Sequence, residues 1–231
     1  MSLVFIISAP SGSGKSTLVN EIKRLVDRLD FSVSYTTRPP RGSEENGREY
    51  YYTSRQVFER MIANDEFLEH ADVFGNYYGT ARKFLNDAIS RGHDLLLDID
   101  VQGASQLQNN LPDAISIFVL PPTKQELENR LRRRSSAERM TDEAVIRRRL
   151  ETATREIEKF DKYDYILVND KLDDSIDALK AIILTERLRA AGRKPSRVEE
   201  TQIAELAQGR RLKHVRANLG PILDSFRKKT V

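Results

Sequence analysis

Residues 3–16 read LVFIISAPSGSGKS, and this stretch decides the fold of the chain. Leu3–Ser8 is a short, continuous apolar run, which is typical of a parallel strand buried on both faces. A glycine- and serine-rich turn follows, and Ser16–Leu29 then carries apolar residues at helical spacing. A strand, a glycine loop and a helix form the first half of a nucleotide-binding βαβ unit.

The glycine loop matches the phosphate-binding pattern G-x-x-x-x-G-K-[ST], except that Ala9 replaces the first glycine. Glycines let backbone N–H groups converge on a phosphate chain, and the following helix adds the positive end of its dipole. In this pattern Lys15 reaches the β- and γ-phosphates and the Ser16 hydroxyl ligates Mg²⁺. A turn with a chance lysine would not need the flanking strand and helix. The predicted ATP-binding residues are Ala9, Pro10, Ser11, Gly12, Ser13, Gly14, Lys15, Ser16 and Thr17.

The rest of the chain alternates between apolar runs and helical patterns. Further buried strands are predicted at 94–100, 114–120 and 165–168, and helices at 101–110, 123–134, 142–162 and 172–191. This alternation predicts an α/β fold of the P-loop NTPase type, a parallel sheet flanked by helices. The core should comprise residues 1–33 and 83–191.

Two segments read differently from this core. Short aromatic and β-branched pieces between turns predict a small, mixed or mostly antiparallel β insertion at 34–82. Residues 192–231 form a tail with glycine and proline breakers and the spacing of short amphipathic helices. From residue 186 onward twelve Lys and Arg face five Asp and Glu, whereas the rest of the chain is net acidic. We expect the tail to pack on a core surface and to contribute to a homo-oligomer.

The composition of the 231 residues excludes several classes of protein. The chain has no cysteine, which excludes a disulfide-built scaffold and thiolate metal sites. The first apolar run is too short to span a bilayer and lacks the basic start of a signal peptide. We therefore expect a soluble, cytoplasmic protein without a membrane partner. Because the basic surplus belongs to the tail, no specific nucleic-acid partner is expected.

Four separated motifs occur in order along the chain. They are APSGSGKSTL at 9–18, FSVSYTTRPPRGSEENGREYYY at 31–52, FLEHADVFGNYYGT at 67–80 and LLLDIDVQGA at 95–104. Together they resemble guanylate kinases of bacterial type over roughly residues 3–190. The resemblance implies a kinase of purine nucleotide metabolism that transfers the γ-phosphoryl group of ATP to GMP or dGMP, with Mg²⁺ as cofactor.

A guanine site needs groups that match the pairing edge of the base. Guanine presents two donors and one acceptor, so a carboxylate suits the donors and hydroxyls suit O6. The resemblance places the Glu69 and Asp100 carboxylates at the base and the Ser34 and Thr80 hydroxyls at O6. From the residues alone, Glu69 reads equally well as a solvated acid at a strand end.

The phosphate of GMP needs cations and hydroxyl donors. The resemblance assigns this role to Arg38, Arg41, Tyr50 and Tyr78. Asp98 follows a buried strand, where ligands of open parallel sheets bind, and we expect it to act through water, Mg²⁺ or a basic neighbour.

An arginine-rich segment at about 130–150 predicts a helical lid. Phosphoryl transfer needs charge neutralisation and exclusion of water, which lid arginines supply. The resemblance selects Arg134 and Arg149 as catalytic, together with Lys15 and Arg41. It makes Arg130 a support for the ATP phosphates and places Asn169 near the adenine. The segment also contains Arg132, Arg133, Arg139, Arg147 and Arg148.

Two other functions compete with this kinase. A catalytically inactive binding module of the same fold would lack part of the lysine and arginine set, which is present here. A P-loop kinase for another phosphate ester would not need the combination of Ser34, Glu69, Thr80 and Asp100. The residues therefore favour guanine as the base.

Overall fold

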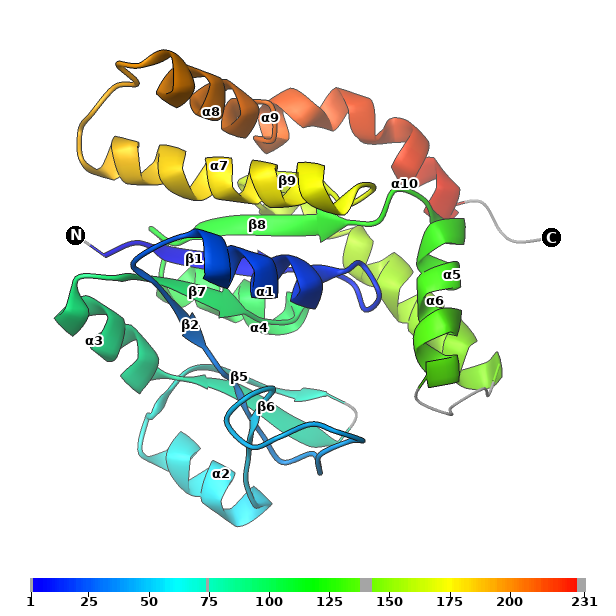
Figure 1. The fold of residues 1–231 in the computed structure, drawn as a ribbon. Helices are drawn as coiled ribbons and strands as arrows, with labels where there is room; N and C mark the ends of the chain where they lie inside the picture. Colours follow the sequence, from blue (N-terminus) through cyan, green and yellow to red (C-terminus); the bar gives the residue numbers. More distant parts are fainter. Residues whose placement is uncertain (1, 74, 138–142, 228–231) are drawn as a thin grey trace. The chain divides into compact units, whose positions relative to one another are not determined.

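The computed structural model describes residues 2–73, 75–137 and 143–227 (Figure 1). A five-stranded parallel sheet has the order β2-β7-β1-β8-β9, and a second, four-stranded sheet has the order β4-β3-β6-β5. No helix in the described ranges is long and apolar enough to cross a membrane. The α/β fold predicted from the sequence is confirmed.

The chain divides into two compact units, which are described separately below. The first comprises residues 1–7 and 27–115, and the second comprises residues 8–26 and 116–231. The core, insertion and tail boundaries drawn from the sequence stay a prediction.

The first unit contributes three strands to the large sheet. They are β1 (Val4–Ser8), β2 (Leu29–Ser32) and β7 (Asp94–Asp98). β7 pairs in parallel with both of the others. Phe5–Ile7 and Leu95–Leu97 are buried, as the apolar runs predicted. The buried Asp94 begins β7, and its carboxylate accepts a hydrogen bond of 2.7 Å from the backbone N–H of Leu3.

The second sheet also belongs to the first unit. Its strands are β3 (Tyr35–Thr36), β4 (Tyr51–Tyr52), β5 (Phe67–Val73) and β6 (Asn76–Ala81). β3 pairs in parallel with β4, whereas β6 pairs antiparallel with β3 and β5. The mixed sheet agrees with the predicted insertion.

Two helices of this unit, α2 and α3, were not predicted. Helix α2 (Arg55–Ala63) begins after Ser54, whose side chain accepts from the backbone N–H of Val57. Its buried Phe58 and Met61 pack against Phe67 of β5. The remaining helices are α3 (Arg82–Arg91) and α4 (Val101–Asn110), and α4 has the predicted bounds.

The second unit contains the phosphate-binding segment. Helix α1 (Lys15–Leu25) buries Leu18, Val19 and Ile22. The prediction that this helix continues to Leu29 is wrong, because Val26 is extended and Leu29 begins β2. The unit also holds β8 (Ile115–Leu120), β9 (Tyr165–Val168), α5 (Lys124–Ala137), α6 (Glu143–Ile157), η1 (Phe160–Lys162) and α7 (Leu172–Ala190).

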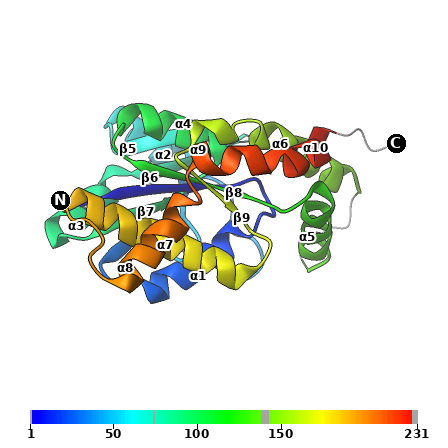
Figure 2. The same cartoon turned by 90° about the horizontal axis from the view of Figure 1, so that it is seen from above.

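The tail folds as a set of short helices. They are α8 (Val198–Gln208), α9 (Leu212–Val215), η2 (Arg216–Leu219) and α10 (Gly220–Arg227). Helix α8 lies along α7, and α10 packs against α5 and α6, as both views show (Figures 1 and 2).

Backbone hydrogen bonds fix the tail to β9. The Ile166 N–H donates to the carbonyl of Arg210 at 2.8 Å, and the Leu212 N–H donates to the carbonyl of Asp164 at 2.9 Å. The tail therefore packs on a core surface, as predicted, and that surface belongs to its own chain. The further expectation of a homo-oligomer through the tail finds no support.

Candidate nucleotide sites

The glycine loop of the second unit curls as its sequence predicts. Gly12 and Gly14 have φ of 91° and 88°, and the Ser13 N–H donates to the Pro10 carbonyl at 3.1 Å. Gly14 immediately precedes α1 and makes no side-chain cap, so the first N–H groups of the helix have no capping side chain. Such N–H groups, with the helix dipole, form an anion site. Lys15 and Ser16 lie in the first turn of that helix.

Two residues predicted to bind ATP support this loop from within the protein. The buried Asn169, which follows β9, donates from Nδ2 to the Ser13 carbonyl at 2.8 Å. Arg130 on α5 donates to the Asn169 carbonyl at 3.0 Å and to the Ser13 carbonyl at 3.4 Å. A Cβ at Gly14 would lie 2.3 Å from Asn169 Nδ2, so this position requires glycine both for its φ and for this approach.

The arginines of the predicted lid lie on α5 and α6, which pack against each other. Arg132 forms ion pairs with Glu128 and Glu143, and Arg133 forms one with Glu126. Arg134 is exposed and Arg149 is half-buried. On α6 an open pocket is lined by Ala144, Arg147, Arg148, Glu151 and Arg155. Arg139 lies outside the described residues, and the catalytic roles of Arg134 and Arg149 stay predictions.

The donor atoms of the second unit fit a magnesium ion that is bound together with nucleotide phosphates. The Ser16 side chain is exposed at the start of α1, where it can offer one hydroxyl oxygen. The described residues contain no group of three or more acidic or histidine side chains that could hold a metal. Mg²⁺ commonly takes one or two protein ligands and completes its shell with phosphates and water.

In the first unit a β-bulge brings together two residues predicted to read the base. Phe67 pairs with Ala81, but Glu69, not Leu68, pairs with Thr80, because the register shifts between Phe67 and Glu69. The Thr80 hydroxyl donates to Glu69 Oε1 at 2.7 Å, and both residues are buried. The extra residue of the bulge thus places the carboxylate beside the hydroxyl.

The environment of Glu69 alters its ionisation. Burial raises its pKa to about 7, the charge of Asp100 adds to this effect, and the hydrogen bond from Thr80 opposes it. Asp100 caps α4 by accepting from the Gly103 N–H at 2.7 Å. A Cβ at Gly103 would lie 2.6 Å from Glu69 Oε2, so only glycine gives the carboxylate room there. Glu69, Thr80 and Asp100 therefore form one cluster.

A second cluster of the first unit contains the residues predicted for the acceptor phosphate. The guanidinium carbon of the buried Arg38 lies 5.4 Å from the centre of the Tyr50 ring. The rings of Tyr50 and Tyr78 meet edge to face, with centres 5.7 Å apart. Burial raises the pKa of Tyr50, so its phenol stays protonated and can donate.

The other predicted acceptor residues lie on the same unit. Arg41 is exposed in the loop after β3, and Ser34 precedes β3, where its carbonyl accepts from the Tyr51 N–H at 2.9 Å. Asp98 ends β7 and is half-buried. Their contacts with a nucleotide stay predictions.

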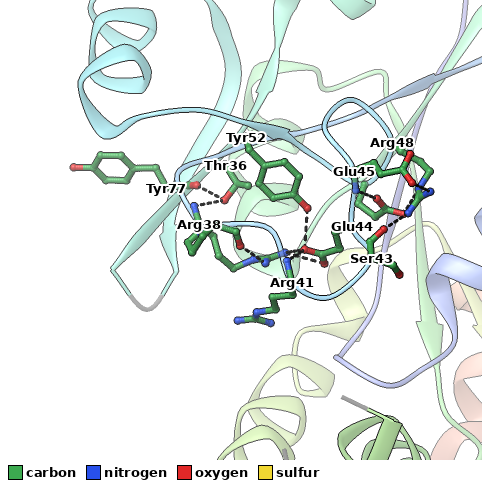
Figure 3. A network of polar contacts seen from close by, with 11 residues as sticks. Thr36, Arg38, Arg41, Ser43, Glu44, Glu45, Arg48, Tyr52 and Tyr77 are labelled. Carbon is green, nitrogen blue, oxygen red and sulfur yellow. Dashed lines mark hydrogen bonds and ion pairs between the residues drawn. The ribbon is translucent and has the colours of Figure 1, made fainter. Parts of the chain in front are cut away.

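Sequence reasoning missed Glu44, the residue that holds Arg38. Arg38 Nη2 lies 3.0 Å and 2.9 Å from the two carboxylate oxygens of Glu44 (Figure 3). Tyr52 also donates from its hydroxyl to Glu44 Oε2 at 2.8 Å. The sequence did contain a signal for this contact, because Glu44 is an acid three residues after Arg41 in a loop with two arginines.

The parallel α/β sheet and the glycine loop between β1 and α1 define the chain as a P-loop nucleotide-binding protein. A sequence profile described as "Guanylate kinase" matches residues 1–186. The chain therefore belongs to the guanylate kinase family.

Individual relatives agree with this family. The chain is 54% identical to the guanylate kinase of Koribacter versatilis over 227 residues, which cover 98% of this chain and 97% of the relative. It is 45% identical to that of Escherichia coli K12, with 83% and 91% of the two chains covered. The crystal structure of guanylate kinase from Anaplasma phagocytophilum matches with a TM-score of 0.65 at 35% identity, covering 80% of this chain and 86% of that one.

Proposed function

We propose that this chain is an ATP:GMP phosphotransferase that converts GMP or dGMP to the diphosphate and releases ADP. The observation that carries the proposal is the buried pair of Glu69 and Thr80, joined by a hydrogen bond of 2.7 Å. A buried carboxylate beside a buried hydroxyl suits the guanine edge, which offers two donors and one acceptor.

Base selection follows from the cost of unpaired polar groups. Ionised Glu69 accepts from N1–H and the 2-amino group of guanine, with Asp100 nearby, while Thr80 and Ser34 are the candidate donors to O6. Adenine presents a different pattern and would leave buried groups of the site without partners. Each such group costs about 1–3 kcal/mol, so the site discriminates strongly between the two bases.

The acceptor phosphate is a dianion and matches the cation and phenols of the Arg38 cluster. Arg38, Tyr50 and Tyr78 are already gathered there, and Arg41 stands at the edge of the same loop. The GMP phosphate is itself the nucleophile, so the reaction does not depend on a side chain acting as a strong base.

On the donor side, the N–H groups of the glycine loop and Lys15 hold the phosphates of ATP. Mg²⁺, bound by the Ser16 hydroxyl and by phosphate oxygens, would supply charge neutralisation. Asn169 and Arg130 keep the loop in shape through the Ser13 carbonyl. Arg134 and Arg149 are proposed to neutralise the transferred phosphoryl group.

A parallel assay of ATP consumption with GMP, AMP, CMP and UMP tests this function. We expect rapid turnover with GMP and little with the other three. Equal activity with all four would refute base selection by the Glu69 cluster. No activity with any of them would favour an inactive binding module of the same fold.

A further inference from the structure

Glu44 occupies a central place among the groups that surround Arg38. Its carboxylate accepts from Arg38 Nη2, from the Arg41 backbone N–H at 2.8 Å and from the Tyr52 hydroxyl at 2.8 Å (Figure 3). The side chains of Arg38 and Glu44 are only 7% and 21% exposed, so water screens their ion pair less than a surface pair.

The ionisation of the groups around Glu44 keeps this network charged. Burial by itself raises the pKa of Glu44, but the Arg41 N–H, the Tyr52 hydroxyl and Arg38 together lower it below its usual value. Burial and the bond to Glu44 raise the pKa of Tyr52 to about 12, so its phenol remains a donor. Glu44 is therefore an anion at neutral pH, held by three separate donors.

The bonds to Glu44 and Pro39 leave further N–H donors of Arg38, and this guanidinium also interacts with the Tyr78 hydroxyl. A guanidinium has five N–H donors. The bonds to Glu44 come from Nη2, and Nη1 donates to the Pro39 carbonyl at 2.7 Å, so these contacts use at most three donors. Contacts within its own loop therefore hold the guanidinium in one orientation, and this orientation determines where its remaining N–H groups point.

The same carboxylate fixes the loop that carries the second arginine. The backbone of Arg41 binds Glu44, while the Arg41 guanidinium points away from that carboxylate (Figure 3). Pro39 and Pro40 restrict the backbone between the two arginines. Glu44 therefore ties together the side chain of Arg38 and the backbone of Arg41.

We propose that Glu44 is a positioning residue for the acceptor phosphate, which orients Arg38 and sets the distance between Arg38 and Arg41. The inference rests on the proposed function, in which Arg38 binds the GMP phosphate. An alternative is that Glu44 merely occupies the phosphate position and leaves when GMP arrives. The two bonds to Arg41 and Tyr52 favour positioning, because they hold the carboxylate independently of Arg38.

The test compares Glu44→Gln with Glu45→Gln, its neighbour in the loop. Glu45 pairs with the exposed Arg48 at 2.8 Å and, in the described part of the chain, makes no hydrogen bond or ion pair with Arg38. Glu45→Gln therefore removes one carboxylate charge from the same loop without changing a contact of Arg38. The dissociation constants of GMP and guanosine are measured for each variant, since guanosine carries the base without the phosphate. Thermal unfolding of each variant confirms that the fold is kept.

Glu44→Gln should weaken GMP binding by about tenfold or more, because a charged hydrogen bond to Arg38 is lost. Guanosine affinity and the KM of ATP should stay unchanged, and Glu45→Gln should alter neither. In Arg38→Ala, adding Glu44→Gln should cause a smaller further loss than in the unmodified chain, because only the hold of Glu44 on the Arg41 backbone remains to be lost.

Three results would overturn the inference. Unchanged GMP affinity in Glu44→Gln would remove any positioning role, and equal loss of GMP and guanosine would indicate general damage to the loop. Tighter GMP binding would show that Glu44 competes with the phosphate. If Arg38→Ala itself left GMP affinity intact, the assignment of Arg38 under the proposed function would fail, whatever Glu44 does.

Discussion

The glycine loop of the second unit and the Arg38 cluster of the first unit are both suited to phosphate, but different parts of the chain build them. The loop relies on backbone N–H groups, and its supports, Asn169 and Arg130, bind a backbone carbonyl. The Arg38 cluster, made of Arg38, Tyr50 and Tyr78, uses side chains, and Arg38 is itself held by the side chain of Glu44. A backbone site tolerates most single side-chain losses, whereas a site of side chains depends on each of its members.

The largest effect is expected at Lys15, the cationic side chain of the glycine loop. Lys15→Ala removes a cation from the transferring phosphates, which is worth about 3–4 kcal/mol in the transition state. Because each 1.36 kcal/mol of barrier changes the rate tenfold, turnover should fall by about two to three orders of magnitude. GMP affinity should be unchanged, as measured by calorimetry without ATP. A nearly normal kcat would show that Lys15 does not stabilise the transferring phosphates and would contradict the role proposed for the glycine loop.

The acceptor side should respond strongly to the loss of one carboxylate charge. Glu69→Gln replaces one carboxylate oxygen with an NH2 group, which donates and cannot accept from a guanine donor, and the unpaired groups cost up to about 3 kcal/mol. The kcat/KM for GMP should fall roughly 100-fold, while the KM for ATP stays constant. Steady-state kinetics with each substrate varied in turn would check this. A fall in ATP affinity of the same size would contradict the separation of the two sites.

The raised pKa of Glu69 makes base binding depend on pH. With a pKa of about 7, the carboxylate is mostly protonated at pH 6, so guanosine affinity should fall about tenfold for each pH unit below 7. Folding stability should respond in the opposite sense. The folded-state pKa exceeds the unfolded value, so the contribution of Glu69 is present below about 4.5 and is lost as the pH rises through about 7.

Guanosine titrations from pH 5.5 to 8 would measure this effect without interference from the phosphate of GMP. The Glu69→Gln variant is the control, and its affinity should show no such slope. A flat profile for the unmodified chain would mean that Glu69 is ionised throughout this range or does not bind the base.

The smallest effect is expected when a methyl group is added next to the Glu69 carboxylate. In Gly103→Ala the new Cβ would lie 2.6 Å from Glu69 Oε2, so the side chain must shift. An overpacked site of this kind costs about 1 kcal/mol, or roughly a fivefold rise in the KM for GMP. Gly220→Ala, where a Cβ meets no atom within 4 Å, should leave the kinetics unchanged. Equal KM values in both variants would show that the Glu69 carboxylate can move without loss.

Much of the fold was contained in local patterns. The continuous apolar runs at β1, β7, β8 and β9 predicted buried parallel strands, because every side chain of such a strand meets a packed layer. The glycine loop could also be predicted from the sequence. All the residues that bind the phosphates lie within one short segment, so their spacing is visible without the fold. Helix α2 was not predicted because its segment lies among short aromatic strands. Helix α1 was predicted too long because Leu29, the first residue of β2, continues the helical spacing of apolar residues.

The sequence alone determined that the chain has a phosphate loop on an α/β sheet and which residue types could read a guanine. Only the tertiary structure decided how the acceptor residues meet. A bulge, and not spacing, sets Glu69 opposite Thr80, and burial, and not residue type, raises the pKa of Glu69. The bond of Glu44 to Arg38 likewise depends on how a loop folds back on itself. Register, burial and loop closure arise from contacts between distant residues, and the physical reason they escape prediction is that no local pattern encodes them.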